Sequence, residues 1–462
     1  MSKESPVSRH FGSEIEYTFS FADKTKNHKT ASVSHRKTPG MKQAGQYFEN
    51  GSRFYIDVGL IEYATPECRT LKELTVHEFA GEEIVRDTYL GEKSELASIH
   101  KRSLSPYIIS PPKGYGAHEN YTTTMNIKGG HISRTRDSLA AHFATRTIFI
   151  GAGQPTPEGF RLGQKIHDIQ TSEGETSTQN KALVNTRTEH HEGNAQGLHR
   201  LHVVCGDANM SPWAVRMKFG TTSLMLRLLE HGVDVQDLFL ANALDSAKDV
   251  ASGVEGISSP LNLRSGKTHS ALNIQEELAS RAHDLSQRIE LPQEENEVIG
   301  DWFTIIDALR EYSETGKHQR ELSQLDWYTK KQIIDGRRSK EEHQGKKKTE
   351  QIKEISLWDS HYDDVEKGWG ITLRKKGRFS HNPTDAEKEE ARTTPPEGRA
   401  KLRGALIKRL AEQWNTGDLS IGHVGWDYFK HPQQSGVRKM PIDGDYSPEA
   451  VQPKVERWLP KK

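Results

Sequence analysis

Residues 50–67 contain side chains that could hold a phosphate group, bind a metal ion and move a proton. Polar and apolar residues alternate from Arg53 to Val58, and successive side chains of a β-strand point to opposite faces. One face then presents a cation, a phenol and a carboxylate, from Arg53, Tyr55 and Asp57. The opposite face is apolar and should pack on a core, with Phe54, Ile56 and Val58. The polar face therefore indicates a site carried by a strand.

Two glutamates earlier in the chain suggest a metal ion. Glu14 and Glu16 are two residues apart in a predicted strand, residues 11–21, so both carboxylates point the same way. At about 4 Å, two such charges repel by about 4 kcal/mol for an effective dielectric of about 20, and a divalent cation removes this cost. The alternative is that both glutamates lie exposed on the wet face of a strand.

Further candidate ligands lie along the chain at Glu62, His118, Glu119 and His202. Carboxylate oxygens with an occasional imidazole suit Mg²⁺ or Mn²⁺ better than they suit a metal that prefers thiolates. Such a set favours phosphate chemistry. Each histidine taken alone would more often be a core or hydrogen-bonding residue, so only the number of candidates favours a site.

Several other chemistries are excluded by spacing. No His-Glu-x-x-His zinc-protease motif begins at His77 or His118. Gly266–Thr268 lacks the first glycine of a phosphate-binding loop, and Gly151–Gly153 is not followed by the third glycine of the dinucleotide pattern. The chain also lacks a Gly-x-Ser-x-Gly nucleophile elbow. A nucleotide would therefore be bound in another way.

The composition excludes some classes of partner. The 462 residues include 64 Lys and Arg and 64 Asp and Glu, so the net charge indicates no nucleic-acid or anionic-membrane partner. No apolar run approaches the roughly 20 residues of a membrane helix, and the first residues lack the apolar core of a secretory signal. We therefore expect a cytoplasmic protein. Cys68 and Cys205 have no metal-binding spacing, which argues against a disulfide framework and a structural zinc.

The pattern of apolar residues predicts the main elements. Strands are expected in residues 11–21, 53–58, 121–127, 147–150 and 201–204. Helices are expected in residues 70–100, 221–231, 273–289 and 399–414, the last with a stripe of Leu402, Leu406 and Leu410. Polar loops are expected in residues 23–43, 171–180 and 380–398. A domain boundary is therefore expected near residue 380.

Taken together, these segments resemble the Pup ligase and depupylase family, whose relatives are glutamine synthetase and glutamate-cysteine ligase. The matching motifs occur in family order over nearly the whole chain. They are Gly12–Tyr17, Asn50–Asp57, Glu62–Glu67, Tyr115–Tyr121, Thr145–Arg146, Gly151–Gly153, Asn185–His190, Arg200–Ser211, Leu325–Trp327 and Thr394–Gly404.

The resemblance implies an α+β fold like that of glutamine synthetase, with a curved, mainly antiparallel sheet backed by helices. Residues 1–380 would form the catalytic domain, and residues 381–462 a small C-terminal domain that completes the nucleotide site. The implied cofactors are ATP and Mg²⁺.

The resemblance also implies a role for each matched position. The magnesium-site candidates are Glu14, Tyr55 and Glu62. The ATP-site candidates are Arg53, Thr65 and Trp426. The residue at the position of the family's catalytic aspartate is Asp57. Further candidates on the metal side are Glu16, Glu119 and His202.

The activity implied by the resemblance is that of an ATP-dependent carboxylate-amine ligase. ATP would phosphorylate the γ-carboxylate of the C-terminal glutamate of a small, disordered Pup-type modifier. A lysine of a target protein would then attack the γ-glutamyl phosphate. The alternatives are a depupylase that hydrolyses the same isopeptide bond and a small-molecule ligase similar to glutamate-cysteine ligase.

Differences between the two branches of the family favour the ligase. The segment Tyr17–Asn50 is short where depupylases carry a long insertion, and Arg399–Gly404 looks ligase-like. Two features are more like a depupylase: Tyr17 stands where ligases usually have Phe, and the gap between Asp57 and Glu62 has depupylase spacing. We therefore expect a divergent member that is closer to the Pup-protein ligase.

Overall fold

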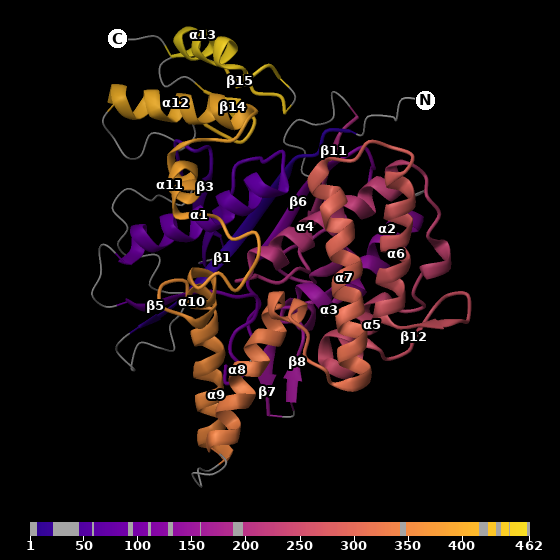
Figure 1. Ribbon diagram of the computed structural model, residues 1–462. Helices are drawn as coiled ribbons and strands as arrows, with labels where there is room; N and C mark the ends of the chain where they lie inside the picture. Colours follow the sequence, from indigo (N-terminus) through magenta and orange to yellow (C-terminus); the bar gives the residue numbers. More distant parts are fainter. Residues whose placement is uncertain are drawn as a thin grey trace. The chain divides into compact units, whose positions relative to one another are not determined.

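The structure is a computed structural model (Figure 1). It describes residues 7–21, 46–57, 60–90, 96–109, 112–127, 133–157, 159–187, 197–341, 348–414, 424–430, 436–442 and 444–459. The chain divides into two compact units. Unit 1 comprises Met1–Ser8, His100–Thr188 and Leu201–Asn382, and unit 2 comprises Arg9–Ile99, Glu189–Arg200 and Pro383–Lys462.

An antiparallel sheet in unit 2 carries the predicted polar face. Four neighbouring strands of this seven-stranded sheet are, in spatial order, β1 (Phe11–Phe21), β4 (Leu60–Ala64), β3 (Arg53–Asp57) and β2 (Gln46–Tyr47). The register places Glu62 of β4 beside Glu16 of β1 and also beside Tyr55 of β3. Because side chains alternate along each strand, these three residues share a face with the other site candidates of β1 and β3.

The opposite face of this sheet is apolar and packs against helix α1 (Leu71–Leu90). Phe54, Ile61 and Tyr63 on that face are fully buried. The helix comes so close that a Cβ atom at Gly81 would lie 2.1 Å from the ring of Tyr63. Burial of this face fixes the register, because a slip by one residue would move every apolar side chain to the polar side.

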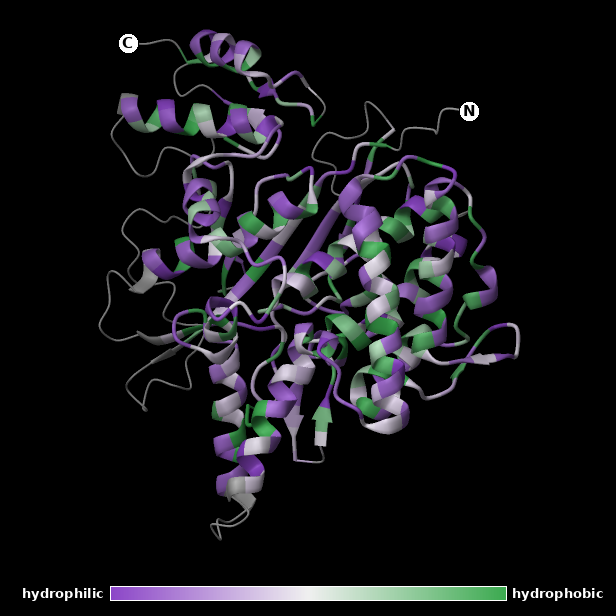
Figure 2. Ribbon diagram, viewed as in Figure 1, coloured by the Kyte–Doolittle hydropathy of each residue, from purple (hydrophilic) through white to green (hydrophobic). Residues whose placement is uncertain are grey.

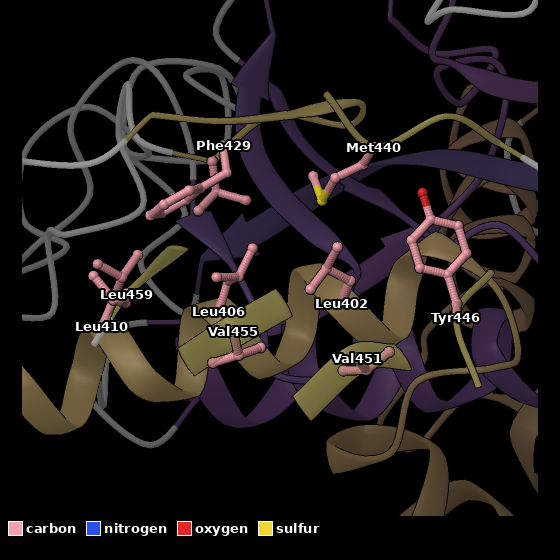
Figure 3. Packing of buried hydrophobic residues seen from close by; sticks show 10 residues of the cluster. Leu402, Leu406, Leu410, Phe429, Met440, Tyr446, Val451, Val455 and Leu459 are labelled. Atoms are coloured by element: carbon pink, nitrogen blue, oxygen red, sulfur yellow. The ribbon is translucent and has the colours of Figure 1, made fainter. Parts of the chain in front are cut away.

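The C-terminal part of unit 2 has a hydrophobic core of its own (Figure 3). Its elements are α11 (Asp385–Thr393), α12 (Arg399–Trp414), β14 (Tyr428–Phe429), β15 (Arg438–Lys439) and α13 (Pro448–Trp458). Leu402, Leu406 and Leu410 of α12 are buried in this core together with Val451 and Val455 of α13. The predicted helix and its leucine stripe are therefore confirmed.

Unit 1 is mainly helical and is arranged around α4 (Pro212–Glu230), in which every residue from Pro212 to Leu228 is buried. Helices α2 (Ser133–Thr145), α6 (Ala271–Ser286) and α7 (Gln293–Thr315) pack against α4, and α6 and α7 run side by side (Figure 1). Hydrophobic and hydrophilic residues alternate along these helices (Figure 2), as expected where one side faces a core.

The described part of the chain contains further strands and α-helices. The strands are β5 (Leu96–Lys101), β6 (Ala117–Thr123), β7 (Gln154–Thr156), β8 (Gly159–Arg161), β9 (Thr171–Gly174), β10 (Ala182–Asn185), β11 (His199–Val203), β12 (Leu261–Asn262) and β13 (Thr268–His269). The helices are α3 (Thr147–Ile150), α5 (Ala243–Ser252), α8 (Asp326–Glu341), α9 (Lys348–Tyr362) and α10 (Trp369–Lys375).

Four charged side chains are buried together in unit 1. Arg102 lies 2.6 Å from Asp359, and Lys330 lies 3.1 Å from Asp359 and 2.9 Å from Asp363. None of the four side chains is more than 1% exposed. Two cations thus balance two carboxylates, and loss of either cation would leave an uncompensated buried charge.

Several predicted elements are wrong or incomplete. Thr147–Ile150 is a helical turn and not a strand, because a short apolar run has no periodicity that separates the two. The predicted helix 70–100 ends at Leu90, and its last residues belong to strand β5. Strand β9 occupies the start of the predicted loop 171–180, and α11 lies within the polar stretch 380–398.

Other predictions concern the bounds of elements. The helix predicted at 221–231 begins earlier, at Pro212, and the strand predicted at 121–127 ends at Thr123. The strands at 11–21 and 201–204 and the helix at 273–289 are confirmed within a few residues. The predicted loop 23–43 and Val58 lie outside the described residues.

The chain passes from unit 1 to unit 2 between Asn382 and Pro383, close to the predicted boundary. The C-terminal segment shares its unit with residues 9–99. The division into domains of residues 1–380 and 381–462 therefore stays a prediction. Within the described part of the chain, we find no helix with the length and apolar character needed to cross a membrane.

Candidate active site

Three carboxylates meet on the polar face of the unit 2 sheet. One carboxylate oxygen from each of Glu16, Asp57 and Glu62 lies within 4.8 Å of the other two. Glu62 is 2% exposed and Glu16 is 8% exposed, whereas Asp57, the last residue of β3, is partly exposed. The cluster therefore has two buried carboxylates and one that solvent can reach.

The environment of these groups opposes negative charge. Burial raises the pKa of Glu62 well above its ordinary value, and the charges of Glu14, Glu16 and Asp57 act in the same direction. Burial and the charges of Glu62 and Glu14 also raise the pKa of Tyr55 well above 10.0. Tyr55 is therefore a neutral phenol at physiological pH, and its hydroxyl donates a hydrogen bond to Glu62.

This set of donors fits a hard divalent cation. Carboxylate oxygens are the ligands that Mg²⁺ prefers in proteins, and a bound cation would offset the repulsion that raises the pKa of Glu62. Glu16, Asp57 and Glu62 bring their carboxylate oxygens close enough together to hold the ion, and the charge of Glu14 also acts on Glu62. Asp57 lies at the accessible margin of the cluster, and Tyr55 orients Glu62 through its hydrogen bond.

Arg53 supplies a cation on the same face of the sheet. Its guanidinium lies 4.5 Å from the ring centroid of Tyr55 and 5.5 Å from that of Tyr47 on β2. The neighbouring position on β4 is the buried Ala64. These cation–π contacts hold the partly exposed Arg53 where an anionic group could meet it.

Thr65 directly follows β4 and is tied to β1. Its hydroxyl accepts a hydrogen bond from the backbone nitrogen of Ser13 at 3.0 Å, and its own nitrogen donates to the Ser13 carbonyl at 2.9 Å. The Ser13 hydroxyl in turn donates to Glu78 of α1 at 2.6 Å. Thr65 is thus held firmly at the end of the strand that carries Glu62.

Trp426 lies against Tyr47. The two rings meet edge to face, with centroids 5.2 Å apart and planes at 81°. Burial raises the pKa of Tyr47 to about 12, although the charges of Arg53 and Arg403 act against this shift. Tyr47 therefore contacts both Trp426 and Arg53, two of the predicted ATP-site residues.

Two further metal candidates, Glu119 and His202, belong to unit 1. The carboxylate of Glu119 accepts hydrogen bonds from Arg146 at 2.6 and 2.9 Å and from Tyr121 at 2.6 Å. Since Glu119 is fully buried, this ion pair gives it a structural role. The ring of His202 meets the ring of His118, with centroids 5.0 Å apart. The metal roles of Glu119 and His202 stay predictions.

The fold of unit 2 brings Glu16, Tyr55, Asp57 and Glu62 together, with Arg53 on the same face. Thr65 lies directly after β4 and is bonded to Ser13 of β1, and Trp426 lies against Tyr47 of β2. The roles assigned to all these residues from the sequence stay predictions.

Sequence reasoning missed an ion pair next to Trp426 whose arginine is buried. Arg403 of α12 binds Glu67, which is 336 residues away in the sequence. Both residues lie in the motifs that carry the family resemblance, but their pairing could not be inferred from either motif. The sequence held one signal for this pair: Arg403 lies next to Leu402, in the leucine stripe of a predicted helix, where a charged residue would need a partner.

Comparison with known proteins identifies the family. The family model described as Pup-ligase protein matches residues 4–430. The chain belongs to the Pup ligase family. Curated relatives named Pup-protein ligase come from Mycolicibacterium smegmatis, Acidimicrobium ferrooxidans and a Nocardioides species.

The match to these relatives is extensive. The Mycolicibacterium protein is 32% identical over 388 residues, which cover 80% of this chain and 82% of the relative. The Acidimicrobium protein is 33% identical over 383 residues, which cover 80% and 81%. The Nocardioides protein is 32% identical over 426 residues, which cover 88% and 90%. The prediction of a ligase of this family is confirmed.

Two solved structures share the fold. One is a crystal structure of the complex between the prokaryotic ubiquitin-like protein Pup and its ligase PafA, with a TM-score of 0.77 and 24% identity over 98% of this chain and 92% of that chain. The other is the Pup ligase PafA in complex with ADP, with a TM-score of 0.73 and 24% identity over 94% and 93%. The predicted α+β fold is therefore confirmed.

Proposed function

We propose that this protein is an ATP-dependent ligase that joins a Pup-type modifier to lysine side chains of target proteins. The bond forms between the γ-carboxylate of the modifier's C-terminal glutamate and the lysine amine. Family membership and relatives named Pup-protein ligase support this proposal. The observation that carries it is the cluster of Glu16, Asp57 and Glu62 on the same sheet face as Arg53.

The first step transfers a phosphoryl group from ATP. An oxygen of the glutamate γ-carboxylate forms a bond to the γ-phosphorus, the bond to the β–γ bridging oxygen breaks, and ADP leaves. Arg53 places a fixed cation beside the transferring group, where charge stabilisation is the main contribution that a protein can make. A magnesium ion at the carboxylate cluster would offset the charge of the triphosphate.

The second step is attack of a lysine amine on the γ-glutamyl phosphate. The amine nitrogen bonds to the acyl carbon, phosphate leaves, and the ammonium proton must go to a base. Asp57 is the candidate base, because Glu16 and Glu62 are buried whereas Asp57 is partly exposed at the end of its strand. A substrate lysine could therefore reach Asp57 more easily than the other two carboxylates.

The nucleotide site in this proposal comprises Arg53, Thr65 and Trp426. Trp426 offers an aromatic surface and Thr65 a hydroxyl at the end of β4, while Arg53 offers positive charge for a phosphate. Glu14, Glu16 and Glu62 would hold the magnesium ion, with Tyr55 orienting Glu62. The reaction would take place in the cytoplasm, where ATP is supplied.

The decisive experiment incubates the protein with ATP, Mg²⁺, a Pup-type peptide ending in glutamate and a lysine-bearing protein. A shift of the lysine-bearing protein on a gel that requires ATP supports the ligase. Release of peptide from a preformed conjugate, without formation of conjugate, would instead indicate a depupylase. Consumption of ATP with free glutamate and a free amino acid would indicate a small-molecule ligase.

A further inference from the structure

Helix α12 lies directly on the turn that precedes β3, and two glycines allow this contact. Gly51 has φ of +79°, and a Cβ atom there would lie 2.9 Å from the Cβ of Ala400. A Cβ atom at Gly404 would lie 2.0 Å from the carbonyl oxygen of Glu49. Because Arg53 follows this turn by two residues, the position of α12 is coupled to the start of the strand that carries the site.

A single buried guanidinium joins the elements around this contact. Arg403 of α12 is 0% exposed. Its Nε donates to the carbonyl of Gly51 at 2.9 Å, and its Nη1 donates to the carbonyl of Trp426 at 2.8 Å. The two Nη atoms also bind the two carboxylate oxygens of Glu67, which lies just after β4. Arg403 therefore connects the turn before β3, the end of β4 and the main chain of Trp426.

The carboxylate at this junction is held charged. Burial alone would raise the pKa of Glu67, but the charges of Arg403 and Arg399 lower it well below its ordinary value. Arg399 donates from Nε to Glu67 at 2.6 Å. With two arginines around it, Glu67 fixes the orientation of the Arg403 fork.

The same guanidinium lies in a layer of aromatic rings. Arg403 is 4.7 Å from the ring centroid of Trp426 and 5.7 Å from that of Tyr47. Tyr47 in turn contacts the Trp426 ring at its edge and the Arg53 guanidinium. The layer thus runs without interruption from buried Arg403 to Arg53 on the polar face.

We propose that Arg403 is a positioning residue for the nucleotide site, which sets ATP affinity by fixing Trp426 and, through Tyr47, Arg53. The proposal rests on the function proposed above, in which Trp426 and Arg53 bind ATP. The hydrogen bonds of residue 403 require an arginine. Only a planar guanidinium can bind a carboxylate with two nitrogens and also donate to two backbone carbonyls. A lysine would keep the charge and lose most of these bonds.

The test compares Arg403→Lys with a matched change on the same helix, Arg409→Lys. Arg409 lies on the same helix and pairs at 3.6 Å with Glu412, whose side chain is 54% exposed. We expect Arg403→Lys to raise the Kd for ADP, measured by calorimetry, and the KM for ATP by about tenfold or more. The kcat at saturating ATP and the KM for the modifier should change by less than about threefold.

A double-substitution cycle tests whether Arg403 acts through Trp426. In a Trp426→Ala background, Arg403→Lys should weaken ADP binding by less than about twofold, since the residue to be positioned is gone. Independent multiplication of the two effects would overturn the proposal. So would an unchanged Kd for ADP in Arg403→Lys, or a loss of kcat with unchanged nucleotide affinity.

A second variant covers the case in which Arg403→Lys does not fold. Glu67→Gln keeps the shape of the side chain and removes the charge that orients the fork, so it should also weaken ADP binding, by about threefold or more. Normal ADP affinity in Glu67→Gln would overturn the proposal in that case. Because ADP binding needs no ligation, a parent that binds ADP without forming conjugate would refute the proposed function and leave this test intact.

Discussion

Glu62→Gln should separate two properties of the carboxylate cluster: the repulsion that destabilises the fold and the capacity to bind Mg²⁺. Glutamine has nearly the same shape as glutamate and can still accept the hydrogen bond from Tyr55. It cannot carry the negative charge that burial and three neighbouring carboxylates oppose at this position. We therefore expect the variant to be at least as stable as the parent when no divalent ion is present.

The size of the effect follows from the distances. Carboxylate oxygens of Glu16 and Asp57 lie within 4.8 Å of one on Glu62. At about 5 Å, each pair of like charges costs roughly 3 kcal/mol for an effective dielectric of about 20. The raised pKa of Glu62 means that proton uptake already relieves part of this repulsion. The expected gain in the free energy of unfolding is therefore about 1 to 3 kcal/mol.

The assay is the midpoint of thermal unfolding, measured in EDTA and again with Mg²⁺. In EDTA, Glu62→Gln should unfold at the same or a higher temperature than the parent. Added Mg²⁺ should raise the midpoint of the parent, because a ligand of the native state stabilises it, and should raise that of the variant much less. Lower stability of the variant in EDTA, or equal stabilisation of both proteins by Mg²⁺, would refute the reasoning.

Glu295→Gln is the matched control. Glu295 is also 2% exposed, but it faces Arg227, with Nε at 3.1 Å, and accepts a hydrogen bond from Ser223 at 2.7 Å. Neutralising Glu295 removes the nearer of the two carboxylates beside the buried Arg227, since Glu230 lies 3.9 Å from the same guanidinium, and this should cost about 1 to 3 kcal/mol. The same chemical change should therefore have opposite signs at the two positions.

Three other predictions concern different parts of the molecule. Asp57→Asn should bind ADP like the parent but form conjugate about 10²- to 10⁴-fold more slowly, as measured by gel densitometry; a parental rate would rule out Asp57 as the base. Lys330→Met should lower the free energy of unfolding by about 3 to 5 kcal/mol, because Asp359 and Asp363 lose a buried cation. Chemical denaturation measures this change, and a loss below about 1 kcal/mol would show that water compensates the two carboxylates. For Glu67, whose pKa is lowered in the folded state, the stabilisation is present above its ordinary value of 4.5 and is lost as the pH falls below it. The thermal midpoint of the parent should therefore fall more steeply below pH 4.5 than that of Glu67→Gln, and parallel curves would contradict this assignment.

The polar face of the sheet could be predicted because it depends on local alternation. Once β3 is a strand, Arg53, Tyr55 and Asp57 must share a face. The cluster itself could not be predicted from the residues alone, because it depends on register. The pairing of Glu16 with Glu62 across β1 and β4 is set by burial of the opposite face and by α1.

The errors in the predicted elements also have physical causes. Helix α12 was found because three leucines recur on one face of it. Helix α11 was missed because Ala391 is the only buried residue among its nine described positions, which leaves no apolar stripe to detect. The apolar residues of Thr147–Ile150 fit a buried strand and a buried helical turn equally well. Their pattern therefore cannot show that this segment is a helical turn.

The proposed nucleotide site draws on both ends of the chain, and this explains why its junction contains an ion pair with a buried arginine. Arg53 and Thr65 lie near the start, Trp426 lies near the end, and Glu67 and Arg403 are 336 residues apart. The entropy cost of closing a loop grows only slowly with its length, and unit 1 folds most of the intervening residues into a compact body. The orientation of α12 on the turn before β3 must still be specified. A bidentate arginine–carboxylate pair supplies direction as well as attraction, whereas apolar contacts alone would let α12 slide or rotate on the turn below it.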